Sequence, residues 1–391
     1  MKNHTIITNV SIVLTNCIIE QSWVEVEDGL IKQIGAEHST VPDSIIEKNA
    51  KVIDGKGGYL LAGFIDVHVH GGANEDFMDA TQASLDKITK MHMEHGTTTI
   101  LATTVTGSHE QLDHVIREVA AYNSKPMPYA QLIGVHLEGP FVNPKWKGAQ
   151  NEAYMIEPQL NWLETWQKQY PNQIKMQTLA PEVNGGYAYI EALTKHGIVA
   201  ACGHTDATYA QIEEAVAHGL KHAVHTYNAM KGLHHREPGT LGAVMSIPKI
   251  MAEVIADGKH VHPVAIKLLL KAKGVEGVLL VTDAMSAAGM PDGNYMLGEL
   301  EVIVENSTAR LAKDGSLAGS TLTMIEGYRY LVKEVGLTLS EASQLASLNP
   351  AKVLGLEHSH GSIATGKRAD LIIANQALNI EQVLIAGEAK L

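Results

Sequence analysis

Cysteine, aromatic residues and positive charge are all scarce in this chain of 391 residues. Two cysteines, Cys17 and Cys202, are too few for a disulfide framework, so we expect a cytoplasmic protein in a reducing compartment. No apolar run approaches the roughly 18 residues that a membrane helix needs, and we expect no membrane span. The formal net charge of -13 argues against a nucleic acid or an anionic membrane as partner.

Glycine and aliphatic residues are plentiful instead, with 35 glycines and 45% hydrophobic residues. Apolar strand-like runs alternate with amphipathic stretches such as 85–94 and 209–218, which is typical of an α/β protein. A doubly wound open sheet is the alternative, but it would not bring strands one, three, five, six and eight to one point. The repeated alternation of strand and helix patterns therefore predicts a (β/α)8 TIM barrel, a fold whose active site lies at the carboxyl ends of the strands. We expect the eight strands to end near His70, Thr106, Gly139, Glu182, Thr205, Met230, Asp257 and Met285.

Both chain ends show a different sequence pattern, with short runs in which apolar and polar residues alternate as in a half-buried strand. Near the amino end, Asp28 and Gly29 form a predicted hairpin turn between the strands 23–27 and 30–34. Near the carboxyl end, 367–374 and 381–385 are two further predicted strands. We therefore predict a small β-sandwich domain from residues 1–56 and 358–391, and a barrel domain from 57–357.

Six side chains that can bind metals follow the predicted strands. The first two are His68 and His70, in Asp-Val-His-Val-His-Gly, and alternate residues of a strand share one face. A lone His-x-His pair more often consists of ordinary polar side chains, but six residues in matching places favour a metal site. Histidine with carboxylate suits Zn(II), Fe(II), Co(II) or Mn(II), and the pattern does not choose among them. The other four are Glu138, His204, His225 and Asp283.

These residue types indicate metal-assisted hydrolysis. A bound divalent ion lowers the pKa of water from about 16 towards about 7. Asp283 can bind the metal and accept the proton, and the two oxygens of Glu138 can bridge two ions. His136 is expected to pack behind the site. Five histidines in helical stretches are expected at the surface: His92, His95, His109, His114 and His218.

With these residues assembled, the chain resembles the N-acetylglucosamine-6-phosphate deacetylases of the amidohydrolase superfamily along nearly its whole length. His-x-His and the final Asp are shared across the superfamily, whereas Leu-Glu-Gly-Pro, Asn-Ala-Met and Arg-Glu-Pro-Gly are more specific to the deacetylases. The resemblance rests on the segments 64–71, 136–141, 178–182, 203–205, 225–230, 236–239, 255–261, 281–284 and 317–320.

The resemblance implies hydrolysis of the acetamide of N-acetylglucosamine 6-phosphate to glucosamine 6-phosphate and acetate. It implies that Glu138, His204 and His225 hold the principal metal. Asp283 would take the proton of the attacking water and return it to the leaving amine. In a homodimer, Arg236 would bind the substrate phosphate in the active site of the other subunit, because its guanidinium can form two parallel hydrogen bonds to a phosphate. The implied sugar-phosphate contacts are Asn228, Ala229, Arg236, His260, Leu317, Ala318 and Gly319.

Two departures from the family pattern affect these expectations. Some members lack the His-x-His pair and bind one metal, whereas His68 and His70 are both present here and allow a second ion. Some members carry histidine at the position of Gln150, which follows Ala149 in the expected substrate site. Gln150 can donate a hydrogen bond but no charge, which leaves the metal as the main electrophile.

Other functions remain open at this point. The substrate could be an N-acetylgalactosamine phosphate or a cyclic amide, because sugar stereochemistry is not readable from the sequence. A non-catalytic sugar-phosphate-binding protein is the other class. Asp283 beside a full ligand set argues against that class, since binding alone needs no proton shuttle.

Overall fold

The computed structural model describes residues 4–46 and 50–391, and eight parallel strands within this part form one sheet. The order along the sheet is the order along the chain, and the two edges meet. The Asp283 N–H donates to the His68 carbonyl oxygen at 2.8 Å, and the His70 N–H donates to the Ala284 carbonyl oxygen at 2.8 Å. The sheet is therefore a nearly closed barrel, and the predicted fold class is confirmed. Its strands are β5 (Phe64–Asp66), β8 (Thr97–Thr104), β9 (Gln131–Glu138), β10 (Ile174–Leu179), β11 (Val199–Cys202), β12 (His222–Ala223), β13 (Met251–Ile255) and β14 (Val278–Val281).

The barrel strands are apolar on both faces, because one face packs inside the barrel and the other against helices. On β11, Val199 and Ala201 join the cluster inside the barrel, whereas Ala200 and Cys202 join the core beneath the helices. Three strands end clearly earlier than predicted, β5 at Asp66, β12 at Ala223 and β14 at Val281. The polar residues that follow them therefore lie on βα loops.

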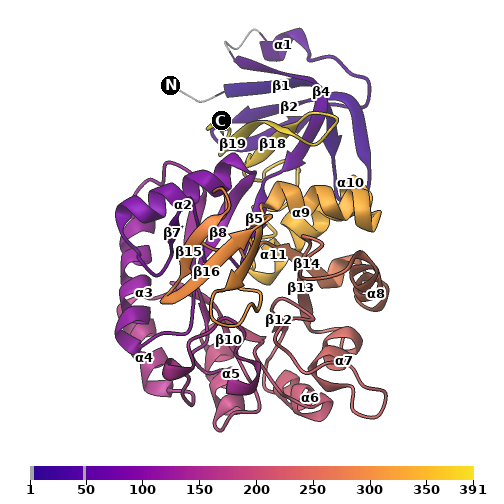
Figure 1. Ribbon diagram of the computed structural model, residues 1–391. Coiled ribbons are helices and arrows are strands. Elements are labelled where there is room, and N and C mark those ends of the chain that lie inside the picture. Colours follow the sequence, from indigo (N-terminus) through magenta and orange to yellow (C-terminus); the bar gives the residue numbers. More distant parts are fainter. Residues whose placement is uncertain (1–3, 47–49) are drawn as a thin grey trace.

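Helices surround the barrel, as Figure 1 shows. Side-chain caps start several of them, including capping boxes at Ser108 and Thr208. The predicted amphipathic stretches 85–94 and 209–218 correspond to α2 (Gln82–Glu94) and to α6 (Tyr209–Ala217) with its C-cap His218. The helices are α1 (Asp43–Ile46), α2 (Gln82–Glu94), α3 (His109–Asn123), α4 (Leu160–Gln169), α5 (Gly186–Lys195), α6 (Tyr209–Ala217), α7 (Gly239–Ser246), α8 (Pro263–Lys273), α9 (Met324–Tyr330), α10 (Leu339–Ser343) and α11 (Asn349–Val353). Short 3-10 or π-helical turns are η1 (Pro144–Trp146), η2 (Glu152–Tyr154), η3 (Val275–Gly277), η4 (Leu331–Val335) and η5 (Gln344–Leu348).

One of the helical histidines is not at the surface. His92 on α2 is fully buried, and its Nε2 donates to the Gly71 carbonyl oxygen at 2.9 Å. The prediction for His92 is wrong because α2 packs against the turn formed by β6 (Gly71–Gly72) and β7 (Glu75–Asp76) as well as against the barrel. His95, His109, His114 and His218 are partly exposed.

Both chain ends contribute to a second, seven-stranded sheet, seen at the top of Figure 1. The predicted hairpin turn at Asp28 and Gly29 is present, with φ of 51° and 81°, the positive values of a type I′ turn. A sheet-rich domain from both ends is therefore confirmed, and its exact boundaries stay a prediction. In spatial order the strands are β20 (Glu388–Ala389), β19 (Ile380–Ile385), β18 (Leu371–Ala374), β4 (Lys51–Ala62), β1 (His4–Val13), β2 (Ile18–Glu27) and β3 (Leu30–Ile34).

A three-stranded antiparallel sheet is inserted between β14 and α9. It consists of β15 (Gly293–Leu297), β16 (Leu300–Glu305) and β17 (Thr308–Leu311), and β15 and β16 are drawn in orange in front of the barrel in Figure 1. The turn between β15 and β16 places Leu297 at the carboxyl end of the barrel strands. In the part of the chain that the structure describes, no helix is long and apolar enough to cross a membrane.

Candidate metal centre and active site

The six predicted metal-binding residues all lie at the carboxyl ends of barrel strands. Glu138 is the last residue of β9, and His204, His225 and Asp283 each lie two positions beyond the ends of β11, β12 and β14. These three residues share a positive φ, of 50°, 29° and 50°. Such a backbone costs about 1–3 kcal/mol for a residue other than glycine and persists where the surrounding structure enforces it. The surrounding structure therefore holds the backbone at these three strand ends in an unfavourable conformation that fixes the positions of their side chains.

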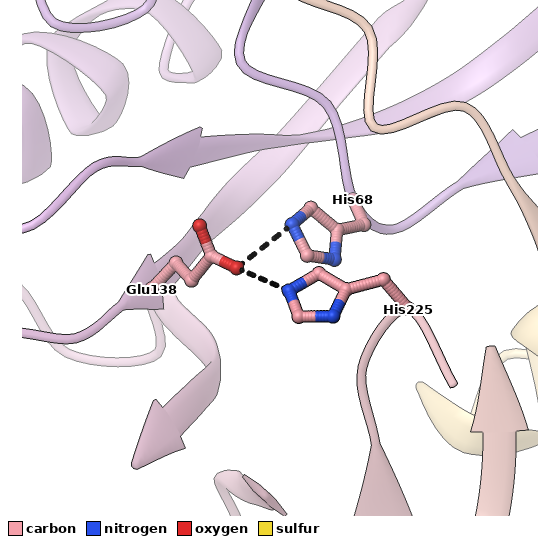
Figure 2. Close-up of side chains that lie close together, drawn as sticks. All are labelled: His68, Glu138 and His225. Atoms are coloured by element: carbon pink, nitrogen blue, oxygen red, sulfur yellow. Dashed lines mark hydrogen bonds and ion pairs between the residues drawn. The ribbon is translucent and has the colours of Figure 1, made fainter. Parts of the chain in front are cut away.

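Glu138 is the centre of the cluster. Its Oε1 lies 3.1 Å from His204 Nε2, 3.0 Å from His225 Nε2 and 3.3 Å from His68 Nε2. Its Oε2 lies 3.3 Å from His70 Nε2. Figure 2 shows the rings of His68 and His225 directed at the same carboxylate oxygen. One carboxylate therefore faces four imidazoles.

Asp283 closes the other side of the cluster. Its Oδ1 lies 3.2 Å from His70 Nε2 and 3.6 Å from His68 Nε2. Within this cluster, two sets of three residues have ligand atoms within 4.8 Å of one another: His68 with Glu138 and His225, and His68 with His70 and Asp283. The predicted residues are therefore brought together, and His68 belongs to both groups.

The cluster has the chemistry of a divalent metal site. The His68 Nε2 is buried with no hydrogen-bond partner among the described residues, and the Nε2 atoms of His204 and His225 lie 3.1 Å apart. Burial opposes charge on His70, but hydrogen bonds to Asp283 and Glu138 raise its pKa to about 9. Burial also opposes charge on Glu138, yet the surrounding histidines hold its pKa well below the usual value. A divalent cation can supply the positive charge that protons otherwise bring here.

Neighbouring groups orient the histidine rings. The Nδ1 of His204 bonds the Trp146 carbonyl oxygen at 2.9 Å, and the Nδ1 of His225 bonds the Asn228 carbonyl oxygen at 3.2 Å. A carbonyl only accepts, so each Nδ1 carries the proton and each Nε2 is free to bind metal. His136 behaves differently, because both of its nitrogens are engaged behind the site. Its partners are the carbonyl oxygen of Val67 at 3.0 Å and the Thr178 hydroxyl at 2.8 Å.

A cavity of about 200 Å³ opens onto the cluster. Ala318 does not reach it, because its side chain is fully buried among the apolar residues beneath the three-stranded sheet. Arg236 does not reach it either, since it lies exposed on the loop between β12 and α7. The other predicted substrate contacts line the cavity: Ala149, Gln150, Asn228, Ala229, His260, Leu317 and Gly319.

Two polar residues of the cavity are firmly held. Gln150 donates from Nε2 to Glu138 Oε2 at 2.5 Å, and its Oε1 accepts from the Thr106 N–H at 2.6 Å. His260 bonds Asp257 Oδ2 through Nδ1 at 2.7 Å, which leaves its Nε2 for a ligand. Gln150 thus supports the Glu138 carboxylate, whereas the Nε2 of His260 is left to contact the substrate.

Sequence reasoning missed Gly148, which lines the cavity, and also Leu297 and Glu253. Leu297 adds an apolar wall from the three-stranded sheet. Glu253, on β13, is fully buried and bonds His68 Nδ1 at 2.8 Å. A lone carboxylate inside the apolar strand Met-Ala-Glu-Val-Ile was the available signal, because an ionised side chain is rarely buried without a partner.

The chain is similar to known proteins along nearly its whole length. Residues 59–390 match the Amidohydrolase family. The chain is 38% identical over 385 residues to the N-acetylglucosamine-6-phosphate deacetylase of Lysinibacillus sphaericus, with 98% of this chain and 97% of that protein covered. It is 36% identical over 376 residues to the N-acetylgalactosamine-6-phosphate deacetylase of Escherichia coli O157:H7, with 95% and 96% covered.

Solved structures agree with these relatives. The structure of an Asp-to-Ala variant of N-acetyl-D-glucosamine-6-phosphate deacetylase from Mycobacterium smegmatis, in complex with N-acetyl-D-glucosamine-6-phosphate, matches with a TM-score of 0.92 at 32% identity over 100% of both chains. The corresponding enzyme of Thermotoga maritima matches with a TM-score of 0.88 at 33% identity over 99% of both chains. This chain therefore belongs to the amidohydrolase family and, within it, to the N-acetylglucosamine-6-phosphate deacetylases.

Proposed function

We propose that this chain hydrolyses the acetamide of N-acetylglucosamine 6-phosphate and releases glucosamine 6-phosphate and acetate. The observation that carries the proposal is the position of Asp283, a buried carboxylate that lies between the cluster of potential metal ligands and the cavity. A protein that only binds a sugar phosphate needs no such proton acceptor. The relatives of the chain supply the substrate class, because they include deacetylases of N-acetyl amino-sugar phosphates.

The cluster would hold one or two divalent ions. Glu138, His204 and His225 make the principal site in this proposal, and His68 and His70 make a second site that shares Glu138 and Asp283. A divalent ion supplies Lewis-acid polarisation of the amide carbonyl and lowers the pKa of water. Zn, Fe, Co and Mn remain the candidates, because histidine with carboxylate ligation suits all four.

Asp283 carries the proton chemistry. Its carboxylate is held ionised although it is buried, because the charge of His68 and the hydrogen bond of His70 lower its pKa. As an anion it accepts a proton from the attacking water. The same oxygen then donates that proton to the departing amine, which completes the hydrolysis without a second acid.

The sugar phosphate would lie along the cavity wall. Asn228 and His260 offer polar contacts to it, whereas Leu297 and Leu317 cover its apolar edges. Gln150 is already engaged with Glu138 and Thr106, so in this proposal it fixes the carboxylate and reaches the substrate through its remaining amide hydrogen.

Arg236 is proposed to serve the neighbouring subunit of a homodimer. It lies outside the cavity of its own chain, and its guanidinium Nη1 lies 2.7 Å from His235 Nε2. Large apolar side chains are exposed on the same loop, namely Leu233 at 59%, and on α8, which contacts α7, namely Val264 at 56% and Leu268 at 54%. A second copy that covers this surface would bury these side chains and bring a guanidinium to a phosphate.

Acetate release from the purified, metal-loaded chain tests the proposed reaction. The panel contains the 6-phosphates of N-acetylglucosamine and N-acetylgalactosamine, together with the two unphosphorylated sugars. We expect the highest kcat/KM with N-acetylglucosamine 6-phosphate. A preference for the galacto epimer would support the alternative substrate, and binding without acetate release would contradict an enzymatic role.

The cytoplasmic location stays a prediction, in keeping with two free cysteines, of which Cys17 is exposed.

A further inference from the structure

Glu253 joins two parts of the metal cluster that arise from different strands. It lies in the middle of β13, one layer below the strand ends, and its side chain is fully buried. Its Oε2 bonds the ring nitrogen Nδ1 of His68 at 2.8 Å and also accepts the backbone N–H of His225 at 3.1 Å. Its Oε1 bonds His222 Nε2 at 2.7 Å. Both carboxylate oxygens are thus used, and three buried donors converge on one side chain.

The hydrogen bond decides which nitrogen of His68 carries the proton. A carboxylate only accepts, so Nδ1 carries a proton, and Nε2, which lies 3.3 Å from Glu138 Oε1, is the nitrogen left to bind a metal. The same Glu253 oxygen restrains the backbone at His225, whose φ of 29° is unfavourable for a residue other than glycine. Loss of this acceptor would release both the His68 ring and the His225 loop.

We propose that Glu253 is a positioning residue that directs His68 and His225 at the metal cluster around Glu138. It would not touch the substrate or the ion. Its role is to fix the tautomer of one ligand and the backbone of another through a single oxygen. The proposal rests on the metal site of the proposed function. Partners that orient metal ligands in this way typically contribute about 10- to 100-fold to metal affinity.

The test compares Glu253→Ala and Glu253→Gln with the parent and with a matched control. Glutamine keeps one acceptor oxygen at this position. The backbone N–H of His225 can only donate, so the side-chain oxygen of the glutamine should face it, and the same oxygen can then accept from His68 Nδ1. The control is Asn349→Ala. Asn349 is equally buried but bonds the carbonyl oxygens of Val275 and Val278, at 2.8 and 2.7 Å, at the opposite end of β14. It reports what the loss of a buried polar group costs by itself.

Zn(II) affinity is measured by competition with a chromophoric chelator. We expect Glu253→Ala to bind zinc about 10- to 100-fold more weakly than the parent, and Glu253→Gln to bind at least about fivefold more tightly than Glu253→Ala. Asn349→Ala should keep the parent affinity although it is less stable. A Glu253→Ala affinity within about threefold of the control would overturn the proposal. So would a glutamine variant that binds no more tightly than the alanine variant.

A second readout needs no metal. With histidines labelled by nitrogen-15, the Nδ1–H proton of His68 should give a signal that exchanges slowly with water, because it is buried and bonded to Glu253. The signal should remain in Glu253→Gln and vanish in Glu253→Ala. Its absence from the parent would overturn the proposal. A parent chain that shows the signal but binds none of Zn, Fe, Co and Mn would refute the metal site of the proposed function while leaving the position of His68 explained.

Discussion

Replacing Arg236 by alanine separates a dimer with shared active sites from a self-sufficient subunit. Arg236 is exposed, and no carboxylate lies within ion-pair distance of it in the part of the chain that the structure describes. The substitution should therefore leave the stability of the subunit nearly unchanged. Loss of a charge-assisted hydrogen bond to phosphate costs about 2–3 kcal/mol. This corresponds to a loss of roughly 30- to 150-fold in kcat/KM for the 6-phosphate, with little effect on the unphosphorylated sugar.

Mixed dimers show whether Arg236 acts across the interface. Arg236→Ala and Asp283→Asn chains are refolded together in equal amounts and assayed at substrate far below KM. Half of the dimers are mixed, and each has one site with both residues intact, so about a quarter of the parent sites should be active. The control mixes parent chains with chains that carry both substitutions. Across the interface, this control also leaves about a quarter of the sites active, because only parent homodimers are complete.

An arginine that serves its own subunit gives a different pair of results. The first mixture would then show no recovery, and the control would keep about half of the parent sites. Size-exclusion chromatography must first show that mixed dimers have formed. No recovery in the first mixture together with half activity in the control would refute the shared site.

Three further predictions concern the cluster and the core. Asp283→Asn should keep the fold and most of the metal but lose at least about a thousandfold in kcat, because the water loses its base and the amine its acid; turnover within tenfold of the parent would contradict this role. Metal analysis of the loaded parent should approach about two ions per chain, and joint replacement of His68 and His70 by alanine should lower it towards about one, so retention of two ions would contradict the second site. Burial lowers the pKa of His92 from 6.5 to about 4, so between these values the unfolded chain binds a proton that the folded chain does not. The free energy of unfolding should therefore decrease as the pH is lowered, by about 3 kcal/mol between pH 7 and pH 4. Urea titrations should show this loss in the parent but not in His92→Gln, and parallel losses in both proteins would contradict the prediction.

The barrel and most of its site were predictable because their signals are local. Each strand is a short apolar run, and each metal-type residue follows such a run within a few positions, as His204 follows β11. Once the chain is a barrel, the carboxyl ends of all strands face one point. Knowing the order of strands was therefore enough to bring Glu138, His225 and Asp283 together, without knowledge of any contact between them.

Residues whose roles depend on contacts from distant parts of the chain were not predictable in this way. Glu253 lies 185 positions from His68 and matches no motif. His92 looks like an ordinary helix residue, and only the turn that covers α2 buries it. Leu297 reaches the cavity because a three-stranded sheet folds back over the barrel.

The sequence by itself thus determined the fold class, the kinds of ligand and the end of the barrel at which they meet. Apolar periodicity and strand order are properties of neighbouring residues, and the closed barrel turns them into one site. The tertiary structure decided which tautomer His68 adopts, which polar groups are buried and that Arg236 lies outside its own cavity. Hydrogen bonds and burial are set by atoms that approach within about 3 Å across the fold, and no spacing along the chain encodes that approach directly.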